Sequence, residues 1–272
     1  MSSPAKPSHA LKRDARSPRE GYGFRNAARM EWIKLRSLRS TFWALLLVIV
    51  SMVAIGVVTM ANTKAPSADK AATFDPTNNV LAGVAVGQLL IGVLGVLVVT
   101  GEYSSGTIRS TLAATPNRRL VLAAKAAVYG GISLAVGEAV TFVTFFAGRA
   151  ALGEGLPEPA LSDPGVLRAV LLSGAYLGLI ALMGIGIGAI TRHTASAIAV
   201  LASVTFVLPA IIGGASGTTV AKFFPTIIAG NSLAVSKPVA DVLSPWVGFA
   251  VLCLYTLLAL GAGLRLLARR DA

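Results

Sequence analysis

Residues 41–61 read TFWALLLVIVSMVAIGVVTMA and contain no charged side chain. About 20 apolar residues in a helix cross the roughly 30 Å hydrocarbon core of a bilayer. Lipid offers the backbone no hydrogen-bond partners, so a run of this length that enters a membrane must form a helix. The stretch therefore predicts a membrane-spanning helix.

Further stretches downstream pass the same test of length and apolarity. The predicted spans are 41–61, 80–100, 124–148, 166–190, 196–214 and 245–267. The fifth is the shortest and contains Pro209, so we expect a kink there. The expected fold class is an all-α integral membrane protein with six transmembrane helices, preceded by an N-terminal interfacial amphipathic helix.

The composition agrees with a membrane protein. Hydrophobic residues make up 54% of the 272 residues and charged residues 13%, about half of the ~25% usual in soluble domains. The single cysteine, Cys253, cannot form an intrachain disulfide. His9 and His193 have no partner at a metal-ligand spacing. We expect no catalytic set, no metal and no cofactor in this chain.

The basic residues are distributed unevenly between the connections. Of 24 Lys and Arg residues, 18 lie on the side of the N-terminus and six on the other. This bias predicts a cytoplasmic N-terminus, and six spans then place both termini in the cytoplasm of a multi-pass protein of the cell membrane. The net charge of +12 is read as a signal of topology and of contact with anionic lipid, with no nucleic acid as partner.

The chain is expected to divide into four parts. Residues 1–23 predict a disordered basic cytoplasmic leader, 41–267 the six-helix transmembrane domain and 268–272 a cytoplasmic tail. Residues 24–40 predict an amphipathic helix on the membrane surface, although a plain basic flank also fits. The apolar stripe of that helix would consist of Phe24, Ala27, Ala28, Leu35 and Leu38.

One outer connection, the third span and three pairs of glycines carry further signals. The outer connection 215–244 contains apolar stretches too short to span, which favours one or two short re-entrant helices. Glu138 is an ionisable residue deep in the third span, and it either lines a translocation path or is a carboxyl satisfied between helices. Glycines four residues apart favour close helix packing, within the chain or at a dimer face. These pairs are Gly83 and Gly87, Gly174 and Gly178, and Gly184 and Gly188.

The inner connection 101–123 is the most informative one. Its first part, 101–119, reads GEYSSGTIRSTLAATPNRR. The residues after Gly106 are compatible with a short helix, which Pro116 ends. A helix held at both ends in this way would transmit force from a partner, and the residues alone fit an ordinary basic loop equally well.

At this connection the chain resembles the permease subunits of ATP-binding-cassette (ABC) exporters of the type-two class. Those permeases commonly carry E-x-x-x-G-T, a short helix and P-x-R. The residues that match are Glu102, Gly106, Thr107, Pro116 and Arg118. The run 31–41, EWIKLRSLRST, is similar to the entry helix of the same family. One departure is that Tyr103 and serines follow Glu102, where many members have a charge-rich stretch.

The resemblance implies that two permease chains, identical or different, each bind a separate ABC ATPase subunit. ATP would bind that subunit, since this chain has no G-x-x-x-x-G-K-[ST] motif. The connection 101–123 would act as the coupling helix, and the connection between the fifth and sixth spans would form an outer re-entrant element. The residues expected to couple to the ATPase are Glu102, Gly106, Thr107, Arg109, Pro116, Arg118 and Arg119.

The expected function is therefore the permease subunit of an ATP-driven exporter. Its apolar, Gly-rich helices favour a hydrophobic or amphipathic small molecule as cargo. A secondary transporter is an alternative, which would need coupling-ion ligands in the spans besides Glu138. A membrane anchor or immunity-type binding protein that transports nothing is a second alternative.

Overall fold

The computed structural model describes residues 23–64, 74–115, 117–153, 156–233, 235 and 242–269. Within these residues the secondary structure is helical, without a β-strand. Six of the segments are long and apolar enough to cross a membrane, which confirms the predicted fold class and the number of spans. The predicted leader lies outside the described residues except for Gly23, and so do residues 270–272 of the predicted tail.

Four of the six spans are single helices along their whole length. These four are α2 (Arg39–Ala61), α6 (Arg118–Ala150), α7 (Val166–Thr191) and α12 (Pro245–Arg269). The second span consists of α3 (Pro76–Val80), η2 (Leu81–Gly83) and α4 (Val84–Ser104). The fifth consists of α8 (Thr194–Ala202), η3 (Ser203–Val207) and α9 (Leu208–Ser216). The shorter helices are α1 (Phe24–Ser37), α5 (Ile108–Ala114), α10 (Thr218–Ala221) and α11 (Pro225–Leu233).

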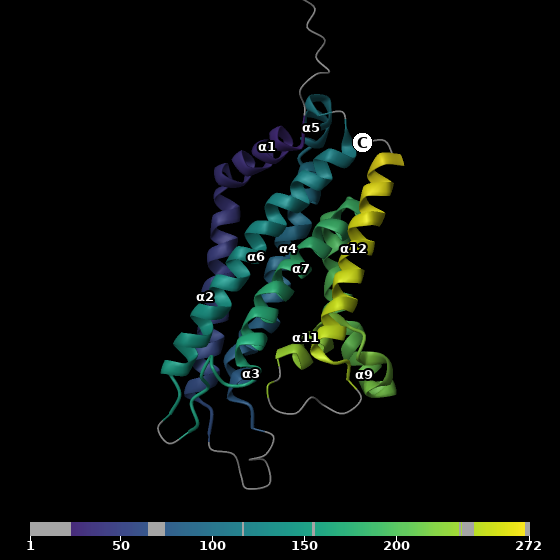
Figure 1. Ribbon diagram of the computed structural model, residues 1–272. Helices are drawn as coiled ribbons and strands as arrows, with labels where there is room; N and C mark the ends of the chain where they lie inside the picture. Colours follow the sequence, from purple (N-terminus) through teal and green to yellow (C-terminus); the bar gives the residue numbers. More distant parts are fainter. Residues whose placement is uncertain are drawn as a thin grey trace, which may run out of the picture.

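Helix α7 is the centre of the bundle, and α4, α6 and α12 pack around it (Figure 1). Small residues allow this close packing: a Cβ at Gly184 would overlap the backbone oxygen of Gly92 on α4. A Cβ at Gly174 would likewise overlap Glu138 on α6. All three glycine pairs noted in the sequence therefore serve contacts within the chain.

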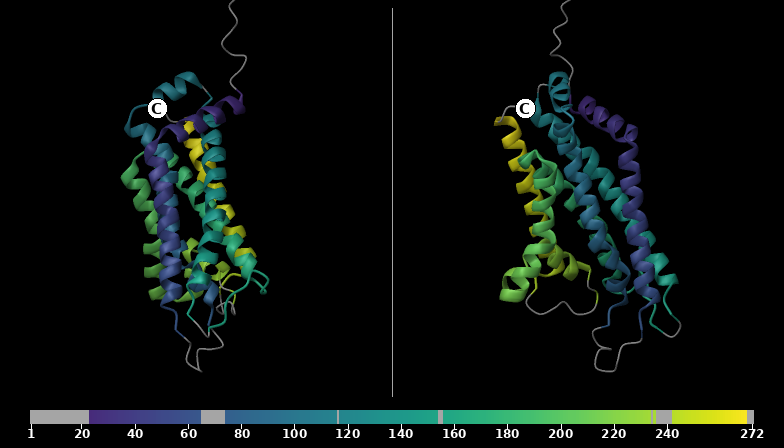
Figure 2. Two further views of the ribbon diagram at one scale, coloured as in Figure 1. Left: turned by 90° about the vertical axis from the view of Figure 1, so that its left-hand side faces the viewer. Right: turned by 180° about the vertical axis from the view of Figure 1, so that it is seen from behind.

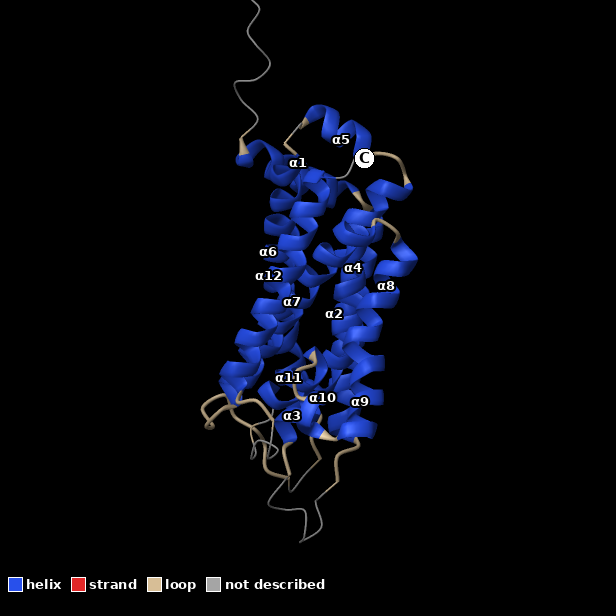
Figure 3. Cartoon of the chain, turned by 90° about the vertical axis from the view of Figure 1, so that its right-hand side faces the viewer, coloured by secondary structure: helices blue, strands red, loops and turns tan. Residues whose placement is uncertain are grey.

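The two ends of the bundle differ in character. Helix α1 lies across one end, at a large angle to α2, and α5 lies beside it (Figure 2). The C-terminal end of α12 is at this same end, here called the α1 end, whereas α3, α9, α10 and α11 are at the opposite end (Figure 3). The segment 215–244, expected to be re-entrant, contains α10 and α11, and α11 packs against α12 and α7.

The fifth span is interrupted where Pro209 enters it. Proline has no N–H to donate to the carbonyl four residues earlier, which is that of Thr205. The helix widens into the π-helical segment η3 just before the proline, a common response to a break in the helical hydrogen-bond ladder. The Thr226 hydroxyl of α11 donates to the Thr205 carbonyl, so α11 supplies the donor that Pro209 lacks.

The helices near the connection 101–123 extend further than the sequence predicted. Helix α4 continues to Ser104 and α6 begins at Arg118, where the Asn117 side chain caps it by accepting from the Leu120 N–H. This cap adds about one and a half turns before the predicted start at residue 124. Only a short segment around α5 therefore remains between the two spans.

Only part of the predicted apolar stripe of α1 packs against the rest of the described chain. Ala27 is buried within the chain, whereas Phe24 and Leu38 are about half exposed, and contact of the stripe with the membrane surface stays a prediction. Leu38 has extended backbone and separates α1 from α2, so it leaves the helix that would have carried it. The second fully buried residue of α1 is Glu31, an acidic side chain among basic neighbours.

Candidate functional site

Four charged side chains meet at the α1 end, and we call them the four-charge cluster. Glu31 and Lys34 come from α1, Glu102 from the last turn of α4, and Lys125 from α6. The Lys34 ammonium lies 3.3 Å from Glu31 and 2.7 Å from Glu102. The Lys125 ammonium lies 2.8 Å from Glu31 and 2.7 Å from Glu102. Each cation therefore contacts both carboxylates.

The cluster is largely removed from solvent. The side chains of Glu31 and Lys125 are 0% and 3% exposed, and those of Glu102 and Lys34 are 12% and 32% exposed. Desolvation of a charge costs several kcal/mol, and close opposite charges offset that cost only with good geometry. With two positive and two negative charges in mutual contact, the cluster is electrically balanced, and loss of any member leaves a buried charge underpaired.

Lys34 connects the cluster to α5. Its ammonium also donates to the Thr111 hydroxyl at 3.1 Å, and Thr111 is a buried residue of α5. Burial lowers the pKa of Lys34, but its hydrogen bond to Glu102 and the nearby Glu31 and Glu102 charges outweigh this, so the pKa is raised above 10.5. Lys34 is thus held as a cation joining α1, α4 and α5.

The local sequence explains part of this arrangement. Glu31 and Lys34 are three residues apart on α1 and so share one face of the helix. The backbone turns after α4 at Gly106, whose φ of +72° lies in the left-handed region that glycine adopts at little cost. Helix α5 then runs back over the cluster, with Ile108 and Thr111 buried beneath it.

The residues predicted to face the ATPase fall into two groups in the structure. Glu102 lies inside the four-charge cluster and Arg118 is half-buried, with its guanidinium 3.5 Å from the Leu267 carbonyl of α12. The exposed residues of the set are Gly106, Thr107, Arg109 and Arg119. Pro116 lies outside the described residues. The structure thus brings one predicted residue into the cluster and leaves four on the surface of the α1 end.

Glu138 is separate from the cluster. It lies 13 residues beyond Lys125 on α6, about 20 Å along a helix, and packs against Gly174 of α7. Its Oε2 atom is buried and has no hydrogen-bond partner within the part of the chain that the structure describes. A role of Glu138 in a translocation path stays a prediction.

Sequence reasoning did not select Glu31, Lys34 or Lys125 as site residues. Glu31 is the one acidic side chain between residues 24 and 40, on a helix otherwise decorated by Arg and Lys. Lys125 falls inside the predicted third span, where a cation is costly unless paired. An acidic residue on a basic helix and a lysine inside a predicted span each indicate a charge that needs a partner. Nothing in the sequence showed that these two residues pair with each other.

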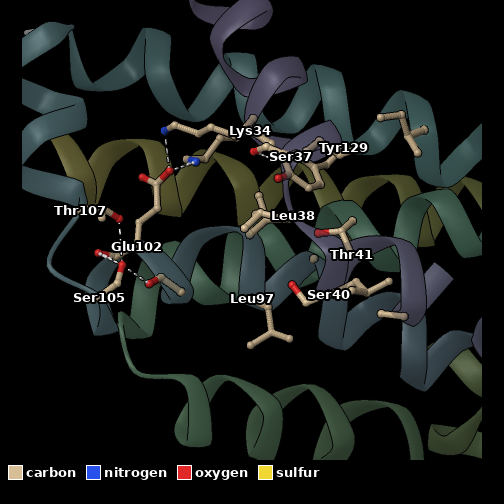
Figure 4. Close-up of a pocket in the computed structure, with 18 of the residues that line it drawn as sticks. Lys34, Ser37, Leu38, Ser40, Thr41, Leu97, Glu102, Ser105, Thr107 and Tyr129 are labelled. Atoms are coloured by element: carbon tan, nitrogen blue, oxygen red, sulfur yellow. Dashed lines mark hydrogen bonds and ion pairs between the residues drawn. The ribbon is translucent and has the colours of Figure 1, made fainter.

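A cavity of about 850 Å³ lies behind the cluster, between the α1–α2 elbow, α4 and α6. Lys34, Glu102 and Lys125 line one side of it. Figure 4 shows Lys34 and Glu102 together on that side, with Leu38, Leu97 and Tyr129 further along the cavity. Its volume is within the range of about 300–1,000 Å³ that is typical of small-molecule pockets.

A family model described as "ABC-2 family transporter protein" matches residues 27–214, a region that includes the four-charge cluster, α5 and the cavity. A search of curated proteins finds no match. The matched region covers more than half of the chain and agrees with the resemblance seen at residues 101–119.

Proposed function

We propose that this chain, which belongs to the ABC-2 transporter family, is the permease subunit of an ATP-driven exporter of a hydrophobic or amphipathic small molecule. Two permease chains, identical or different, would assemble with separate ABC ATPase subunits that bind and hydrolyse ATP. The α1 end would face the cytoplasm and both termini would lie there, because this end carries the excess of basic residues.

The observation that carries the proposal is the contact of one ammonium with three elements. Lys34 contacts Glu31 on its own helix, Glu102 on α4 and Thr111 on α5. The ion pairs of Lys34 hold α1 and α4 together, because separation of such a pair is unfavourable. The hydrogen bond from Lys34 to Thr111 links α5 to both, so a displacement of α5 would be passed on to α1 and α4. Lys125 extends the connection to α6 through the same carboxylates. This arrangement supports α5 as the coupling helix.

The surface around α5 supports an ATPase contact. Residues of the turn and of the outer face of α5 are exposed at the α1 end: Gly106, Thr107, Arg109 and Ser110. Arg109 carries a guanidinium, which binds carboxylates with two parallel hydrogen bonds. We therefore assign the main contact with the ATPase to this surface and a supporting role to Glu102, which holds it in place.

The experiment is a mild-detergent pull-down of the tagged chain from its own cells, followed by sequencing of its partners. We expect a stoichiometric soluble subunit that carries G-x-x-x-x-G-K-[ST]. Arg109→Glu should lower its recovery about tenfold or more, whereas Lys222→Glu, at the opposite end, should leave recovery unchanged. Absence of such a partner with the unaltered chain would contradict the proposal.

A further inference from the structure

The cavity behind the four-charge cluster has a polar side and an apolar side. The polar side carries Lys34, Glu102 and Lys125 together with hydroxyls of α5 and of the turn before it. The apolar side includes Leu94, Leu97, Val98 and Ile132. A cavity with this division fits an amphiphile, whose head group would lie at the cluster and whose apolar body would lie between α2 and α4.

The cluster determines which head group fits. Lys34 already donates to three acceptors, Glu31, Glu102 and Thr111, and an ammonium has three N–H donors in all. Lys34 therefore has no donor left for an anionic head group. Lys125 is 3% exposed and lies between two carboxylates, so an approaching anion would also meet their negative charge.

The acceptor side of the cluster is incomplete. Oε1 of Glu102 accepts from both lysines, but Oε2 of Glu102 is buried without a hydrogen-bond partner among the described residues. A buried acceptor without a donor is costly, more so when it is charged. Figure 4 shows the Glu102 carboxylate on the side of the cavity that also carries Thr107 and Ser105. The oxygen is covered in this structure, so a ligand with a charged N–H donor would satisfy it once the groups that cover it move aside.

We infer that this cavity binds an amphiphile with an ammonium head group that carries N–H donors, with the head group at Oε2 of Glu102. The rim residues Leu38 and Leu97 are both more than 40% exposed, so the apolar body can enter from the lipid side. The proposal that an amine binds here depends only on the cavity. The assignment of the bound amine as exported cargo rests on the proposed function.

The test is native mass spectrometry of the full chain released from detergent, with dodecylamine, dodecan-1-ol and dodecanoate as probes. All three have the same alkyl chain, and the amine is a cation at neutral pH because alkyl ammonium groups have a pKa of about 10.4. We expect one bound dodecylamine, with an affinity about tenfold or more above that of the alcohol and the carboxylate, as a charge-assisted hydrogen bond supplies.

A matched pair of variants locates the binding. Gly101 lines the cavity, and a Cβ there would meet no atom of the described residues within 4 Å, so Gly101→Leu adds an apolar side chain at the cavity wall. Gly261 of α12 is equally uncrowded and does not line the cavity. Dodecylamine binding should fall about tenfold in Gly101→Leu and stay unchanged in Gly261→Leu.

Two phospholipids identify the source of the ammonium. Dioleoyl phosphatidylethanolamine has N–H donors in its head group and dioleoyl phosphatidylcholine has none. Displacement of dodecylamine by the first lipid alone assigns the site to an aminolipid, and displacement by neither assigns it to a free amine. Equal binding of dodecanoate or dodecan-1-ol, or unchanged binding in Gly101→Leu, would overturn the inference. The pull-down of the ATPase is independent of all these outcomes.

Discussion

Lys125 and Glu31, 94 residues apart in the sequence, form an ion pair of 2.8 Å in which both side chains are almost fully buried. The pair fastens α1 to α6, the third membrane-spanning helix. Glu102 contacts the same ammonium and also that of Lys34. Helix α1 is thereby joined to two spans by charge contacts rather than by apolar packing alone.

Loss of one partner of the Glu31–Lys125 pair should be strongly destabilising. We expect Glu31→Leu and Lys125→Met each to lower the free energy of unfolding by on the order of 3 kcal/mol, because each leaves a buried charge underpaired. The double variant should cost less than the sum of the single ones. Thermal unfolding in detergent measures this.

The control is the exposed pair of Arg149 and Glu158, whose side chains are 37% and 60% exposed. Glu158→Ala should cost less than about 1 kcal/mol. A Glu31→Leu variant as stable as Glu158→Ala would show that the cluster does not hold α1 in place.

The backbone at Gly106 should be essential for the position of α5. An L-residue in the left-handed region costs about 1–2 kcal/mol, and a β-branched side chain costs more. Gly106→Val should therefore raise the ATP hydrolysed per molecule of a fluorescent amphiphile exported from vesicles, with membrane insertion intact. Gly106→Asn should preserve coupling, because asparagine tolerates this conformation. Equal coupling in both variants would mean that the turn has no such role.

The contribution of the Thr226 hydroxyl to stability should depend on the presence of Pro209. Thr226→Val leaves the Thr205 carbonyl without its donor and should destabilise the chain by about 1–3 kcal/mol. In a Pro209→Ala background the alanine N–H can serve that carbonyl, so the same substitution should cost much less. A double-mutant cycle of thermal unfolding decides this, and additive effects would argue against the explanation of the π-helical segment.

Alkaline pH should weaken the ion pairs of the four-charge cluster, because Lys34 loses its proton. The pKa of Lys34 is raised above 10.5 in the folded chain, so its stabilising contribution is present below pH 10.5 and is lost as the pH rises through the folded value. Arginine stays charged throughout this range. The loss of thermal stability above pH 10.5 should therefore be smaller in Lys34→Arg, and an identical loss in both proteins would contradict this.

Apolar length predicted the spans and their number, because a membrane helix must satisfy its backbone within one segment. The ends of the spans were less predictable, since Asn117 caps α6 well before the apolar run starts. The four-charge cluster could not be derived, because Glu31, Glu102 and Lys125 meet only once three separate helices pack. Glu102 and Gly106 were selected by resemblance, whereas the partners of Glu102 were visible only in the structure.

The most direct test of the central claim is a site-specific crosslink from α5 to the ATPase. A single cysteine at Arg109→Cys, in a Cys253→Ser background, would carry a photoactivatable maleimide in native membranes. The account predicts one adduct whose second chain contains G-x-x-x-x-G-K-[ST], and no adduct with that chain from Lys222→Cys at the opposite end. No such adduct from position 109, or an equal one from position 222, would contradict the assignment of α5 as the coupling helix.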